Sequence, residues 1–170
     1  RTLEREIAKL ARKSLRQTHR RVEKEGVTFA LLPAEQVPAL LPDLQRVSDA
    51  WLAEKSTREK GFSLGFFSAD YLRRTPVAVV RRDERIVAFA NVLLGGGHEE
   101  MSIDLMRYDP ATAPPSVMDY LFLELMLWGR NDGYRWFSLG MAPFSGFDVR
   151  TLAPLWSRAG AFLFRQGEHF

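Results

Sequence analysis

Asp104 is a carboxylate inside a segment that is otherwise rich in apolar residues, and Arg107 follows it three positions later. The alternation of Met101, Ile103 and Leu105 with more polar residues is typical of a β-strand. A charge in such a strand is costly to bury unless it is paired. Strict alternation puts Asp104 and Arg107 on opposite faces, so a bulge or a strand end is needed to bring them together. Two interpretations stay open. One is a structural ion pair; the other is a site whose carboxylate binds an ammonium while the guanidinium binds a phosphate or carbonyl.

The segment Gly-Phe-Ser-Leu-Gly at 61–65 matches the nucleophile-elbow pattern of serine hydrolases. That motif requires a strand before it and a helix directly after it, so that a strained turn exposes the hydroxyl. Glu59 and Lys60 precede it instead, and no credible triad accompanies it. The pattern therefore does not favour a hydrolase. Three of its residues stay as candidates for the wall of a substrate pocket: Gly61, Ser63 and Gly65.

Metal and thiol chemistry find little support in the composition. The three histidines, at positions 19, 98 and 169, lack the spacing of metal ligands, and the chain has no cysteine. The absence of cysteine excludes disulfides, thiolate zinc sites, iron–sulfur clusters and a cysteine nucleophile. Glu124 interrupts an apolar helical pattern and is expected on an exposed helix face. We expect no metal site.

Charge is distributed unevenly over 170 residues whose composition, 46% hydrophobic and 26% charged, is that of one globular domain. Residues 1–25 hold nine basic and four acidic side chains, whereas the remainder is slightly acidic. This asymmetry indicates nucleic acid or anionic lipid as a partner, unless the helix is only solvated. No apolar run approaches the roughly 20 residues of a membrane span, so the fragment itself is expected to be soluble. The candidate contacts for the anionic partner are Arg12, Lys13, Arg16 and Arg20.

Periodicity and turn residues predict the elements that must position these side chains. Helices are expected over 3–25, 34–53, 69–74, about 115–132 and 151–159, and strands over 27–32, 76–82, 85–94, 99–107, 134–139 and 161–165. This order is similar to that of the Gcn5-related acyltransferases, an α/β (α+β) fold with a mixed sheet flanked by helices. In that fold the fourth and fifth strands diverge and hold the acyl donor between them; here they would be 99–107 and 134–139.

The segment between the fourth strand and the next helix bears on the donor. Acyl-coenzyme A users carry a Gln/Arg-x-x-Gly-x-Gly/Ala turn whose backbone amides bind the pyrophosphate. Residues 108–116 contain no glycine and three prolines, which have no amide hydrogen. A coenzyme A thioester is therefore not expected as the donor.

Several short motifs occur in a fixed order along the chain. They are Val22–Gly26, Glu59–Phe67, Val77-Ala78, Asp104–Tyr108, Met118-Asp119 and Leu139–Pro143. Together they resemble the C-terminal catalytic domain of phosphatidylglycerol lysyltransferases, the multiple peptide resistance factor family, over most of 20–165. The resemblance implies the second half of a tandem acyltransferase-like pair, with a basic helix over 1–26 and an acyltransferase-like domain over 27–170 that is truncated at its C-terminus. Such a fragment is expected to be inactive alone.

The same resemblance implies transfer of lysine or alanine from its tRNA ester to a hydroxyl of phosphatidylglycerol, without a cofactor, at the cytoplasmic face of the bacterial inner membrane. The implied partners are aminoacyl-tRNA and phosphatidylglycerol, with neither DNA nor metal. Asp104 and Arg107 match polar residues that line the family's aminoacyl pocket. We expect Asp104 to bind an ammonium, and Arg107 to hold the aminoacyl group or to face the terminal adenosine phosphate. The alternatives are a non-enzymatic module that binds RNA or anionic lipid, and a coenzyme A-dependent acetyltransferase.

Overall fold

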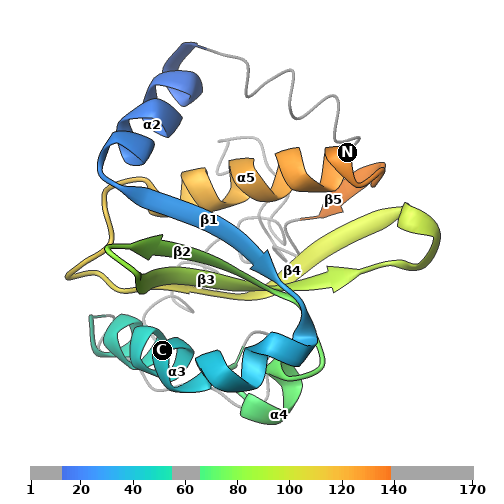
Figure 1. Ribbon diagram of the computed structural model, residues 1–170, viewed down its shortest axis with the longest axis horizontal. Helices are drawn as coiled ribbons and strands as arrows, with labels where there is room; N and C mark the ends of the chain where they lie inside the picture. The colour runs from blue at the N-terminus through green and yellow to red at the C-terminus, as the bar shows by residue number, and fades with distance from the viewer. Residues whose placement is uncertain (1–12, 55–65, 139–170) are drawn as a thin grey trace, which may run out of the picture. The chain divides into compact units, whose positions relative to one another are not determined.

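The computed structural model describes residues 13–54 and 66–138, which form a five-stranded sheet with helices on both faces (Figure 1). Its helices are α2 (Lys13–Lys24), α3 (Val37–Glu54), α4 (Ala69–Leu72) and α5 (Val117–Asn131), with short 3-10 turns at Ala34–Gln36 and Gly96–His98. Its strands are β1 (Val27–Leu32), β2 (Val77–Arg82), β3 (Arg85–Leu94), β4 (Glu100–Tyr108) and β5 (Trp136–Ser138). No helix in these two ranges is both long and apolar enough to cross a membrane.

The predicted order of elements is confirmed across the described residues, with shifts of a few residues at some ends. The helix predicted from about 115 begins at Val117, because Ser116 adopts a left-handed backbone with φ 65°. Pro42 lies inside α3. The predicted helix 151–159, the strand 161–165 and the first ten residues of the helix 3–25 lie outside the described residues.

The sheet runs in the order β1-β2-β3-β4-β5, and all neighbours are antiparallel except β4 and β5. Asp83 and Glu84, both with positive φ, make the two-residue turn between β2 and β3 that the sequence predicted. Within the described residues, β5 pairs only with the first three residues of β4. The expected divergence of these two strands concerns residues after Ser138, which lie outside the described residues.

Two apolar clusters fix the sheet between its helices. Helices α2 and α5 cover one face, where Val22, Leu121 and Leu125 pack against the strands. Helix α3 and the short α4 cover the other face, where Leu44 and Leu72 meet Phe89. Strands β2 and β3 are buried on both sides, so their sequences read as continuous apolar runs. Each fully buried aliphatic or aromatic side chain contributes about 1.5–3 kcal/mol.

Candidate functional site

Strand β4 departs from regular pairing at Asp104. Asp104 and Leu105 together face the single residue Asn91 of β3, which is the geometry of a β-bulge. The fully buried Asn91 side chain fills the gap, because its Oδ1 accepts hydrogen bonds from the backbone N–H groups of Leu105, at 2.7 Å, and Asp104, at 3.2 Å. The bulge that the sequence required for Asp104 and Arg107 to share a side of the sheet is therefore present.

Asp104 is held by a tyrosine from another element. The Tyr71 hydroxyl, on α4, donates a hydrogen bond to Asp104 Oδ2 at 3.1 Å. Ser68 caps this short helix by accepting a hydrogen bond from the Tyr71 backbone N–H, which fixes where the helix begins. Burial raises the pKa of Tyr71, and the hydrogen bond to Asp104 and its negative charge raise it further. Tyr71 therefore remains a neutral donor to the carboxylate well above neutral pH.

Arg107 lies on the same side of the sheet but does not pair with Asp104. Its guanidinium lies over the Trp51 ring of α3, 4.1 Å from the ring centroid, and its Nη1 donates to the Met106 carbonyl at 2.9 Å. In the described part of the chain, no cationic side chain lies within ion-pair distance of Asp104. The interpretation as a structural Asp104–Arg107 ion pair is therefore wrong: the guanidinium lies over the aromatic face of Trp51 instead.

A different aspartate anchors the end of β4. Asp109 is buried, and its carboxylate accepts from Arg46 of α3 at 3.3 Å and from the backbone N–H of Ala111 at 3.0 Å. Arg85 lies 3.8 Å from Asp109 Oδ2, the oxygen that also accepts from Arg46. These contacts hold the chain where it leaves the sheet and turns toward α5.

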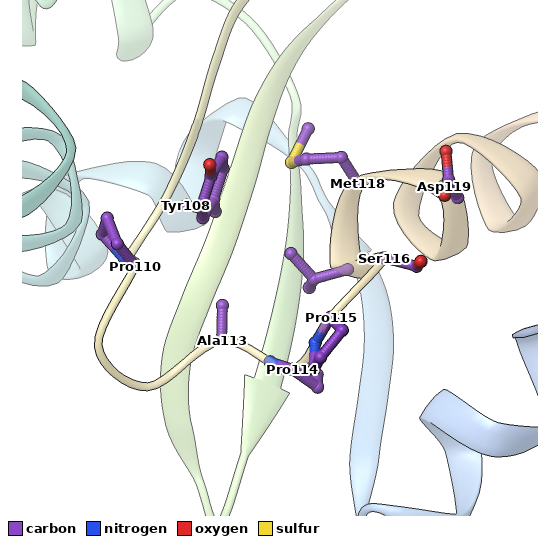
Figure 2. Close-up of a pocket in the computed structure, with 9 residues that line it drawn as sticks. Tyr108, Pro110, Ala113, Pro114, Pro115, Ser116, Met118 and Asp119 are labelled. Atoms are coloured by element: carbon purple, nitrogen blue, oxygen red, sulfur yellow. The ribbon is translucent and has the colours of Figure 1, made fainter. Parts of the chain in front are cut away.

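A pocket of about 470 Å³ lies at this turn, between the end of β4 and the first residues of α5 (Figure 2). Figure 2 shows Tyr108 on one side of it and Met118 on the other, with proline and alanine of the connecting loop between them. The charged residue of its lining is Asp119, a carboxylate. Tyr108 packs toward the α5 side of the sheet, whereas Asp104 and Arg107 contact α4 and α3, so the structure does not bring the pocket and the Asp104 site together.

The structure describes only some of the remaining candidate residues. Gly61, Ser63, Gly65 and Arg12 lie outside the described residues. Lys13 and Arg16 belong to α2, but their side chains are not described; Arg20 is exposed on that helix.

Sequence reasoning missed the groups that position the site. Asn91 had a signal, because it is the one polar residue between Ile86 and Leu94. Tyr71 and Trp51 had none, since each reaches β4 from a distant part of the chain. Glu124 was expected on an exposed face, and this is wrong: it is partly buried against His19 of α2.

Comparisons with known proteins show which family the chain is similar to. The family model of the phosphatidylglycerol lysyltransferase C-terminal domain matches residues 7–170. The chain is 41% identical over 152 residues to the phosphatidylglycerol lysyltransferase of Bacillus subtilis, covering 88% of this chain and 17% of that protein. It is similar to the solved structure of L-PGS from Bacillus licheniformis, with 41% identity and a TM-score of 0.74, over 94% of this chain and 47% of that one.

A more distant likeness concerns the fold alone. An aminoglycoside acetyltransferase from an uncultured soil metagenomic sample has a TM-score of 0.50 at 12% identity, over 85% of this chain and 88% of the other. The predicted acyltransferase-like fold is thereby confirmed. The chain spans less than a fifth of the curated relatives that it matches. By its match to the family model and its identity to these relatives, the chain belongs to the phosphatidylglycerol lysyltransferase C-terminal family.

Proposed function

We propose that this chain is part of an enzyme that transfers lysine from lysyl-tRNA to phosphatidylglycerol. The observation that carries the proposal is Asp104. It is a half-buried carboxylate on β4, it is oriented by Tyr71, and no described side chain neutralises it. Such a group is suited to a substrate ammonium, because a charge-assisted contact in a partly shielded site contributes about 1.5–3 kcal/mol.

The reaction is an ester exchange. The lipid hydroxyl attacks the ester carbonyl carbon, a new C–O bond forms, the bond to the tRNA ribose oxygen breaks, and the hydroxyl proton passes to that oxygen. Little energy separates the two esters, so the protein chiefly has to align the groups and stabilise the oxyanion. Asp104 would orient the aminoacyl group through its ammonium. Arg107, held over Trp51, would supply positive charge to a phosphate or to the ester carbonyl.

The pocket at the start of α5 supports a donor other than coenzyme A. Prolines in its wall provide no amide hydrogens, and the Asp119 carboxylate opposes a pyrophosphate. Because aminoacyl-tRNA is cytoplasmic and phosphatidylglycerol lies in the membrane, the reaction would take place at the cytoplasmic face of the bacterial inner membrane. The basic helix over 1–26, with Arg12, Lys13, Arg16 and Arg20, would contribute contacts to the tRNA.

The test uses the complete parent enzyme with the substitution Asp104→Asn. Transfer of labelled lysine from lysyl-tRNA to phosphatidylglycerol vesicles should fall by roughly ten- to more than a hundredfold, since 1.4 kcal/mol is a factor of ten. The melting temperature should change little, because asparagine can still accept from the Tyr71 hydroxyl. Asp70→Asn is the matched control: it removes an exposed carboxylate of α4 that pairs with Arg73, and transfer should stay unchanged. Wild-type transfer by Asp104→Asn would overturn the assignment.

A further inference from the structure

A cluster of three potential metal ligands lies where α2 meets α5. His19 and Glu23 come from α2, four residues apart and therefore on one face of the helix, and Glu124 comes from α5. His19 Nε2 lies 2.5 Å from Glu124 Oε1, and His19 Nδ1 lies 3.3 Å from Glu23 Oε2. One ligand atom from each residue lies within 4.8 Å of the other two. The sequence did not predict the cluster, because 105 positions separate His19 from Glu124.

The cluster is partly shielded from water. Two carboxylates face one imidazole, and the His19 and Glu124 side chains are only 17% and 23% exposed. Among the side chains that the structure describes, which exclude those of Lys13 and Arg16, His19 is the only group within ion-pair distance of either glutamate. Two carboxylates and one imidazole therefore offer three ligand atoms to a single cation.

We propose that His19, Glu23 and Glu124 bind a divalent transition-metal ion such as Zn²⁺. One imidazole nitrogen and two carboxylate oxygens form a donor set that suits Zn²⁺, whereas Mg²⁺ and Ca²⁺ prefer oxygen alone. The Tyr120 ring, whose centroid is 5.0 Å from that of His19, restricts the orientation of the imidazole.

Binding requires only a small rearrangement. Metal–ligand bonds of about 2.0–2.1 Å in tetrahedral geometry separate the donor atoms by roughly 3.3 Å. The contact between His19 and Glu124 would therefore lengthen, and Glu23 would move in to the same ion; water would complete the coordination. The bound ion would join α2 to α5 and so fix the basic helix against the sheet. This structural role is separate from the proposed transfer chemistry at Asp104.

The test is a titration of the full 170-residue chain with ZnCl₂ by calorimetry and with Co²⁺ by visible absorption. We expect one equivalent of Zn²⁺ to bind at micromolar concentration, and Co²⁺ to give the bands of a site with mixed nitrogen and oxygen ligands. His19→Gln and Glu124→Gln should each weaken binding by at least tenfold without changing the circular dichroism. His98→Gln is the matched control, because His98 is an exposed histidine 3.7 Å from Asp132, and it should bind Zn²⁺ like the wild type.

Two results would overturn the proposal. One is the absence of saturable Zn²⁺ binding up to ~100 µM, which corresponds to a free energy weaker than about −5.5 kcal/mol. The other is binding that survives both His19→Gln and Glu124→Gln, since the ion would then lie elsewhere. If those variants do not fold, Glu23→Gln decides, because the Glu23 side chain is half exposed and its loss leaves the packing intact. Wild-type affinity in Glu23→Gln would then refute the site.

Discussion

Asn91→Ala tests whether the bulge in β4 depends on one buried side chain. In the native structure Asn91 Oδ1 accepts hydrogen bonds from the N–H groups of Asp104 and Leu105, the two residues that share one partner position. Alanine removes that acceptor at a fully buried position, so the two N–H groups lose their hydrogen-bond partner.

The magnitude follows from the two bonds that are lost. Leaving a buried donor unsatisfied costs about 1–3 kcal/mol, so two donors amount to roughly 2–6 kcal/mol. The strand can recover part of this by giving up the bulge. Because neighbouring side chains of a strand point to opposite faces, that change would turn Asp104 away from Tyr71. Asn91→Ala should therefore lower both stability and, in the parent enzyme, lysine transfer.

The assay is urea denaturation of the 170-residue chain, compared with Ser48→Ala. Ser48 is also fully buried and polar, but its Oγ has no hydrogen-bond partner among the described residues. Its removal should change the free energy of unfolding by less than about 0.5 kcal/mol, or raise it. If Asn91→Ala loses no more stability than Ser48→Ala, the hydrogen bonds to the bulge are not what maintains it, and our account of the site geometry fails.

Two further predictions concern pH and charge. The pKa of Tyr71 is raised above its ordinary value of 10.0, so the unfolded state loses this proton first and the free energy of unfolding should fall as pH rises above about 10. The fall should be smaller in Tyr71→Phe, when both proteins are unfolded in urea between pH 9 and 11. An equal pH dependence in the two proteins would contradict the assigned environment. The chain should also bind tRNA in a salt-dependent way, because neutralised phosphates release counterions, and filter binding at increasing salt should show the affinity falling steeply. Binding should be abolished when glutamate replaces four basic residues, Arg12, Lys13, Arg16 and Arg20. Survival of binding in that variant would show that the helix is only solvated.

Much of the fold could be predicted because its signals are local. Strand β3 was expected over 85–94 and occupies those residues, since a continuous apolar run bounded by turn residues specifies a buried strand wherever it packs. The Asp83-Glu84 turn was predictable for the same reason. The start of α5 was not, because the left-handed backbone of Ser116 depends on how the loop after Asp109 is held.

The candidate site divides in the same way. Asp104 and Arg107 could be selected from sequence, because a charged residue in an apolar strand is costly and its presence indicates a purpose. Their partners could not. Electrostatics suggested that the two would pair with each other, whereas the fold supplies Tyr71 for one and Trp51 for the other.

The sequence by itself determined the order of elements, the family and the strand that carries the candidate carboxylate, because periodicity, turn residues and motif spacing are read along the chain. Only the tertiary structure decided which face that carboxylate occupies, what orients it, and that His19, Glu23 and Glu124 meet. The physical reason is the separation along the chain between residues that are in contact. A side chain's partners are set by contacts between segments tens of residues apart, and a one-residue bulge that reverses a side chain's direction leaves almost no local trace in the sequence.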